Sequence, residues 1–197
     1  MMVRILSILP GFVGVLCVIL LLGSLTGFSL PEERSVIDMV PCESEDPELC
    51  LIAMTGDDIS PPFIFGILDI DLEITWEKSE ESWFAVVDSE AAVVCPPNDE
   101  TLLTDCTVKD VENFIIVGGS DEDDGIINWN IETDDYRIIS GGRGADIGEQ
   151  QVLTTNVEIS LNLLVELMLG VISLTLFLGA GEMAFPIRKL FQKFKES

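Results

Sequence analysis

The feature that most constrains this chain is an apolar run near its C-terminal end, from Leu161 to Ala180. The run has 20 residues. At about 1.5 Å per helical residue it would span roughly 30 Å, the thickness of the hydrocarbon core of a bilayer. A second apolar run, from Ile5 to Phe28, lies at the other end of the chain. The two runs predict two transmembrane helices with the rest of the chain between them.

The first run also has the basic start of a signal peptide, with Arg4 ahead of the apolar residues. Signal peptides have an apolar core of about 7 to 15 residues that ends at a small-x-small cleavage site. Here the core is longer, and the best candidate site, Leu25-Thr26-Gly27, fits poorly. We therefore expect a retained signal anchor, with cleavage as the alternative.

Positive charge flanks the two runs on the sides that point away from the middle of the chain. Loops on the cytoplasmic side of membrane proteins are enriched in Lys and Arg. This predicts a cell-membrane protein with two spans, both termini in the cytoplasm and the middle segment outside. The basic tail is expected at the inner membrane surface, where anionic lipid attracts cations, or else it is an ordinary stop-transfer tail. Its basic residues are Arg188, Lys189, Lys193 and Lys195.

The segment between the runs is strongly acidic. Residues 29–157 hold 31 Asp and Glu against five Lys and Arg, which is a net charge of −26. Such a field repels nucleic acid and attracts cations and basic partners, and salt screens it. We therefore exclude nucleic-acid binding and expect a protein partner or a homo-oligomer, the alternative being an acidic surface that serves solubility alone.

The clearest strand in the middle segment is Leu68–Trp76, where apolar residues alternate with acidic or polar ones. A period of two places one face inward and one in solvent, as in an antiparallel sheet packed on one side. Short strands separated by Gly, Pro and Asp turns follow, which favours a sandwich. The fold prediction is mainly β: an antiparallel β-sandwich ectodomain flanked by two transmembrane α-helices. The further strands are expected at 83–88, 91–95, 114–117, 126–131, 136–140 and 152–160, and residues 49–55 are a candidate first strand.

Four of the five cysteines lie in the middle segment, at Cys42, Cys50, Cys95 and Cys106. An even number of cysteines outside the cytoplasm indicates disulfides, and local pairing is the simplest of the three connectivities. We predict the bridges Cys42–Cys50 and Cys95–Cys106. The fifth, Cys17, lies in the first apolar run and is expected to stay an unpaired thiol.

One acidic loop is a candidate calcium site, because hard cations bind several oxygens from a short flexible loop. It comprises Asp121, Glu122, Asp123 and Asp124, just before a glycine. The EF-hand spacing is absent, so the alternative is a solvated hairpin tip. A second acidic group, Asp69, Asp71 and Glu73, shares one face of the predicted strand and is expected to be solvated.

An ionisable residue inside the second apolar run, Glu166, is a functional candidate, since charge at membrane depth is costly. Asn162, Gly170 and Ser173 share its helical face. We predict that this face contacts another helix, with Glu166 reaching interfacial water as the alternative. In the first run, Gly23 and Gly27 form a small-xxx-small pair that would permit close approach.

Catalysis is not supported by the sequence. It contains no histidine, no G-x-S-x-G motif and no P-loop. We therefore predict a non-enzyme without a required cofactor, which displays its acidic domain for protein interaction or assembly at the cell surface. The alternative is an accessory subunit for cation handling that uses Glu166 and the acidic domain. The predicted domains are an anchor at 1–28, an acidic stalk at 29–60, a sandwich at 61–157, a transmembrane helix at 158–184 and a basic tail at 185–197.

The layout of a small β-sandwich followed by a span and a short tail resembles that of the GOLD-domain cargo receptors. Phe191, Lys193 and Phe194 of the tail and the cysteine-braced domain carry this resemblance. The chain differs from that family in lacking a coiled-coil segment before the span and in keeping an N-terminal span. No trafficking function follows from the resemblance.

Overall fold

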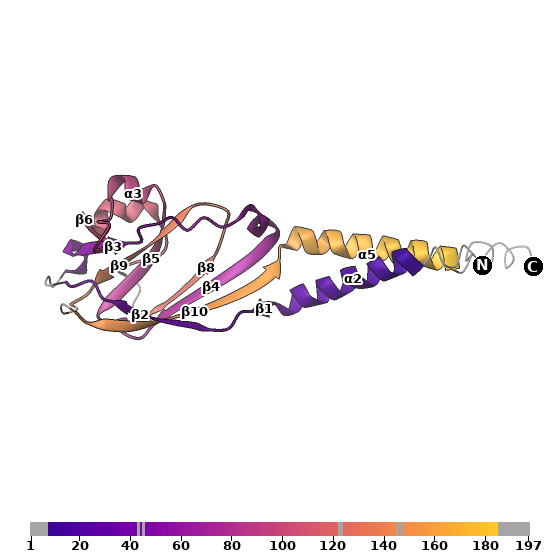
Figure 1. The fold of residues 1–197 in the computed structure, drawn as a ribbon, viewed down its shortest axis with the longest axis horizontal. Coiled ribbons are helices and arrows are strands. Elements are labelled where there is room, and N and C mark those ends of the chain that lie inside the picture. Colours follow the sequence, from indigo (N-terminus) through magenta and orange to yellow (C-terminus); the bar gives the residue numbers. More distant parts are fainter. Residues whose placement is uncertain are drawn as a thin grey trace, which may run out of the picture. The chain divides into compact units, whose positions relative to one another are not determined.

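The structure is a computed structural model that describes residues 8–42, 44, 46–121, 124–144, 146 and 148–184. The chain divides into two compact units (Figure 1). The helical unit comprises residues up to Phe28 and from Ile159 onward, and the β unit is Ser29–Glu158. The chain is therefore mainly antiparallel β with an apolar helix towards each terminus.

The helical unit contains α2 (Ile8–Thr26) and α5 (Leu163–Ala184). By length and composition both helices can cross a membrane. Helix α2 ends because Gly27 adopts a positive φ of 66° and donates its N–H to the carbonyl of Ser24 at 3.0 Å. Helix α5 begins where the side chain of Asn162 accepts the N–H of Leu164 at 3.0 Å, which is an N-terminal cap.

The β unit contains two five-stranded sheets, and the short helices lie between the strands. In the first sheet the strand order is β1, β10, β4, β8, and β2 pairs with β10; in the second it is β6, β3, β9, β5, β7. The first sheet consists of β1 (Phe28–Ser29), β2 (Glu33–Asp38), β4 (Leu68–Trp76), β8 (Ile126–Asn130) and β10 (Gln150–Leu161). The second consists of β3 (Leu51–Met54), β5 (Ser82–Asp88), β6 (Leu103–Thr107), β7 (Ile115–Gly118) and β9 (Tyr136–Gly142). The short helices are η1 (Pro47–Leu49), η2 (Phe63–Ile67), α3 (Ala91–Val94), α4 (Val108–Val111) and η3 (Glu112–Phe114).

Strand β5 lies at the centre of the packing and is buried on both faces. On one face Phe84 and Val86 join a cluster with Ile74 and Ile127, which come from strands of the first sheet. On the other face Trp83, Ala85 and Val87 pack with residues of α3 and α4. Figure 1 shows α3 on the side of β5 opposite β4 and β8. Because both faces are covered, β5 lacks the alternation of apolar and polar residues that marks β4.

The expected strand at Ala91–Cys95 is wrong, because this segment forms the short helix α3. Just before it, the carboxylate of Asp88 accepts the N–H of Glu90 at 2.8 Å and turns the chain. The N–H of Cys95 then donates to the carbonyl of Ala91 at 2.9 Å, which closes a helical turn. A run of four apolar residues does not distinguish a short helix from a strand.

Strand β3 falls within the candidate first strand at 49–55. The rest of the expected stalk at residues 29–60 differs from the structure, because it contributes β2 to the first sheet. Strand β2 pairs with β10 over six residues, from Glu33 opposite Thr155 to Asp38 opposite Gln150. Gly141 and Gly142 form the end of strand β9. A side chain at Gly141 would collide with the ring of Trp83 about 2.5 Å away, so the close approach requires glycine.

Candidate functional site

The β unit has a groove of about 720 Å³ over the first sheet. The polar side chains at the base of the groove come from the alternation of inward and outward side chains along β8 and β4. In β8 the side chains of Ile127 and Trp129 point into the core, so Asn128 and Asn130 point outward beside the acidic face of β4. The residues lining the groove are Ser29, Leu30, Asp71, Leu72, Glu73, Asn128, Trp129, Asn130, Asn156, Val157 and Glu158.

Asparagine side chains hold the carboxylates of β4 in place. Asn130 Nδ2 donates to Asp69 Oδ1 at 2.5 Å and to Asp71 Oδ1 at 3.1 Å. On the other side of β4, Asn156 Nδ2 donates to Glu73 Oε1 at 3.1 Å. The three acidic residues predicted to share one strand face therefore lie together, and amide groups from β8 and β10 order them.

The polar side chains that line the groove can accept hydrogen bonds from a ligand. Each carboxylate is acceptor-only, and an amide that donates its N–H still has a carbonyl oxygen. None of the described residues that line the groove is Lys or Arg. A cationic donor such as a lysine ammonium or an arginine guanidinium is the matching ligand chemistry.

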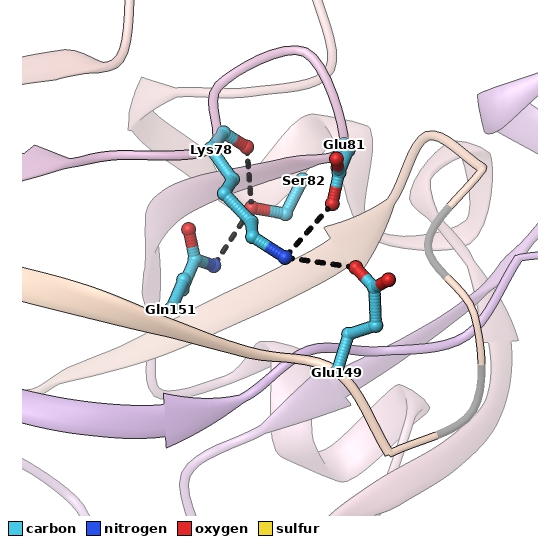
Figure 2. Close-up of polar contacts among 5 residues, drawn as sticks. All are labelled: Lys78, Glu81, Ser82, Glu149 and Gln151. Atoms are coloured by element: carbon cyan, nitrogen blue, oxygen red, sulfur yellow. Dashed lines mark hydrogen bonds and ion pairs between the residues drawn. The ribbon is translucent and has the colours of Figure 1, made fainter.

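A second polar group braces the β unit where β4, β5 and β10 meet. Figure 2 shows Lys78 between two carboxylates, with its Nζ 2.9 Å from Glu149 Oε2 and 3.3 Å from Glu81 Oε2. Beneath it, Gln151 Nε2 donates to Ser82 Oγ at 2.7 Å, and Ser82 Oγ donates to the carbonyl of Lys78 at 3.2 Å. Because Ser82 and Gln151 are buried, these contacts satisfy the serine hydroxyl and the amide N–H of Gln151, which would otherwise be costly to remove from water. The amide oxygen of Gln151 has no hydrogen-bond partner among the described residues.

The hydrogen bond between Lys78 and Glu149 raises the pKa of the lysine and lowers the pKa of the carboxyl. A lowered carboxyl pKa stabilises the fold above the unfolded-state value, and this stabilisation disappears as the pH falls through the folded-state value. A raised lysine pKa stabilises the fold at lower pH and is lost as the pH rises through the folded-state value. The pair therefore stabilises the fold between the acidic and the strongly alkaline range.

We expect Lys78→Met to lower the free energy of unfolding at neutral pH. The difference from the natural chain should shrink as the pH falls below the ordinary carboxyl pKa of 4.5 and as it rises above the ordinary lysine pKa of 10.5. Urea unfolding of the full chain in detergent micelles, repeated across this pH range, measures the difference in free energy of unfolding. The variant K78M/E149Q is the control, since it should lack most of the acid dependence. A difference that is the same at acidic and neutral pH would contradict the prediction.

The two disulfides have the predicted pairing. Cys42 and Cys50 are bridged with their Cα atoms 5.5 Å apart, and Cys95 and Cys106 with theirs 5.9 Å apart. The second bridge ties the end of α3 to β6, a strand that the sequence did not predict. The free Cys17 is buried in the helical unit.

The expected calcium loop is described only in part. Asp121 and Asp124 are exposed, whereas Glu122 and Asp123 lie outside the described residues. Among the residues that are described, no three His, Cys, Asp or Glu side chains are grouped so that they could hold a metal ion. The structure thus adds no support for calcium, and the loop stays a sequence prediction.

The helical unit brings three of the four predicted contact residues against α2. Ser24 Oγ donates to Glu166 Oε1 at 2.7 Å, and Ser173, which is buried, donates to the carbonyl of Gly14 at 3.4 Å. Gly170 lies against Leu21. The fourth residue, Asn162, instead caps the start of α5.

The close approach of α2 to α5 occurs at Gly14 and not at the predicted glycine pair. A Cβ atom at Gly14 would lie 3.3 Å from the ring of Phe177, whereas one at Gly23 would meet nothing within 4 Å. Gly27 lies beyond the end of α2. The spacing of small residues therefore predicted the kind of contact but not its position. The basic tail residues Arg188, Lys189, Lys193 and Lys195 lie outside the described residues.

Comparison of the chain with models of protein families gives no match, and comparison with curated proteins gives none either. The fold and the groove therefore define the chain by its architecture alone: a mainly antiparallel β unit carried between two apolar helices of membrane-spanning length.

Proposed function

We propose that this protein is a non-catalytic, membrane-anchored interaction module. Both apolar helices span a cell membrane, both termini lie in the cytoplasm, and the β unit lies outside. The groove over the first sheet binds a basic segment of a protein partner. The single observation that carries the proposal is the lining of this groove by three carboxylates and three asparagines.

The proposed architecture is a β-sandwich, in which the two sheets pack face to face. The cluster that joins Phe84 and Val86 of the second sheet to Ile74, Ile127 and Trp129 of the first supports this arrangement. Edge-to-face contacts between aromatic rings add to it, including Trp76 with Phe84 at a centroid distance of 5.1 Å.

Three features support the proposed location. The side chains of α5 are largely exposed along its length, for example Leu163, Val171 and Leu178 at 63–68%, which suits a helix that is solvated by lipid. Two disulfides suit an oxidising compartment outside the cytoplasm. The basic residues at the two ends of the chain suit the cytoplasmic side.

A groove variant tests the proposed binding directly. We expect D71N/E73Q/E158Q to bind a short lysine-rich peptide about tenfold more weakly than the natural chain does, which corresponds to about 1.4 kcal/mol. The reason is that amides replace three acceptors that would pair with the cations. Isothermal titration calorimetry on the full chain in detergent micelles, at two salt concentrations, measures the change.

The matched control is D99N/D105N/E112Q, which removes the same number of charges at exposed positions outside the groove. Both variants weaken long-range attraction to the same degree, so only a groove site separates them. Equal binding by the two variants would contradict the groove as the site, even if salt weakened binding by all three chains.

The cation-handling alternative depends on Glu166 being available to a moving ion. In the structure one carboxylate oxygen of Glu166 accepts a hydrogen bond from Ser24, whose own Oγ accepts the N–H of Leu161 at 2.7 Å. This contact favours a helix-packing role for Glu166, because its carboxylate is part of a hydrogen-bonded chain that joins the start of α5 to α2.

A further inference from the structure

The β unit exposes a group of large apolar side chains just before β4. Residues 59–68 form a run of ten without any charged side chain. Within it, the short helix η2 exposes Phe63 by 93%, Ile64 by 59% and Ile67 by 45%. Exposed apolar side chains that are grouped in this way mark an interaction surface rather than ordinary solvent contact.

The segment is held firmly at its base. Ile59 and Tyr136 exchange both backbone hydrogen bonds, at 2.8 and 3.0 Å. Arg137 pairs with Asp58, with Nε 2.6 Å from Oδ1. At the tip, the N–H of Phe65 donates to the carbonyl of Pro62 at 2.8 Å. Because these hydrogen bonds fix the backbone of the segment, Phe63 and Ile64 are exposed at a defined position.

Strand pairing places this segment at one particular end of the β unit. The N–H of Glu77 donates to the carbonyl of Val152, while Glu73 contacts Asn156. Strands β4 and β10 are therefore antiparallel. The start of β4, directly after η2, consequently lies at the end of the unit where β10 leaves it.

The other connection to the helical unit reaches the same end. The N–H of Leu30, just after β1, donates to the carbonyl of Val157 near the end of β10 at 2.9 Å. Helix α2 ends at Thr26 and helix α5 begins at Leu163. The chain thus passes, within a few residues on both sides, from this end of the β unit into segments of membrane-spanning length.

We propose that η2 inserts Phe63, Ile64 and Ile67 into the interfacial region of the leaflet that faces the β unit. The occupant of this apolar face is lipid. The proposal rests on the proposed membrane anchoring, because short connections then hold this end of the unit close to the bilayer. Burial in the headgroup and acyl boundary removes the three side chains from water. The acidic residues that flank the run, Asp58 and Asp69, stay in the aqueous phase and limit the depth of insertion.

Spin labelling of the full chain tests the proposal. In a C17A background, which removes the free thiol, a nitroxide is attached at F63C, V93C or V171C. The protein is reconstituted into phosphatidylcholine vesicles, and accessibility to oxygen is compared with accessibility to a water-soluble nickel chelate. Val93 is the aqueous control, since it is 84% exposed on α3, and Val171 of α5 is the lipid control at 63%.

We expect the ratio of oxygen to nickel accessibility at position 63 to be several-fold higher than at position 93 and lower than at position 171. A ratio at 63 equal to that at 93, with 171 in lipid, would overturn the docking of η2 and leave the membrane anchoring intact. An aqueous ratio at 171 would overturn the anchoring itself. A ratio at 63 that falls to the aqueous value when the protein is diluted in lipid would assign the surface to a second copy and overturn the proposal.

Discussion

Replacing Trp83 with alanine is expected to lower the free energy of unfolding of the β unit by about 3–5 kcal/mol. Trp83 is fully buried on β5 and packs against α3, α4 and the glycine backbone of β9. Its removal leaves a large cavity that the surrounding strands cannot close, because they are tied by hydrogen bonds on both sides of β5. Urea unfolding of the full chain in micelles, followed by the β-sheet circular dichroism signal, measures the loss.

Two further variants make the test specific. Phe63→Ala removes a large aromatic side chain that is 93% exposed, so its cost should stay within about 0.5 kcal/mol in micelles. Trp83→Phe should cost less than Trp83→Ala, since it keeps a ring and deletes the indole Nε1, which is buried and has no hydrogen-bond partner among the described residues. Equal costs for W83A and F63A would mean that β5 is not the centre of the packing.

Removing the bridge between Cys95 and Cys106 should be the next most costly change. The cysteines are 11 residues apart, and chain-entropy arguments give about 3 kcal/mol for closing a loop of this size. Cys95 is also fully buried, so C95A/C106A loses packing as well as the crosslink. The same urea titration, carried out without reductant, measures the change.

The natural control is C17A, which removes the one cysteine that forms no bridge. Because Cys17 belongs to the helical unit, this variant should leave the unfolding of the β unit unchanged. A cost for C95A/C106A as small as that for C17A would show that the crosslink contributes nothing to the β unit.

Local sequence patterns predicted those elements whose environment shows in the sequence itself, such as a strand with one buried face and one solvent-exposed face. The alternation from Leu68 to Trp76 gave the bounds of β4, and the apolar runs gave both long helices. Strand β2 was missed because most of its side chains are exposed on both faces, so no alternation marks it. Its place in the sheet comes from pairing with β10, more than a hundred residues later in the chain.

The candidate site was predicted only in part for a related reason. The acidic face of β4 follows from a period of two within one strand. The asparagines that order it lie on β8 and β10, and they face Asp69, Asp71 and Glu73 because of strand register. Register is set by turns and packing across the whole unit, so no local spacing could have assigned Asn130 or Asn156 to the groove.

The backbone hydrogen bond between Leu30 and Val157 has an implication for the modularity of this chain. The β unit begins and ends at one place, so it is arranged as a cassette inserted into the connection between two helices. Excising the cassette would leave ends that a tight turn could join into a helical hairpin. Grafting it into a loop of an unrelated host would require that host to supply only two anchor points a few ångströms apart.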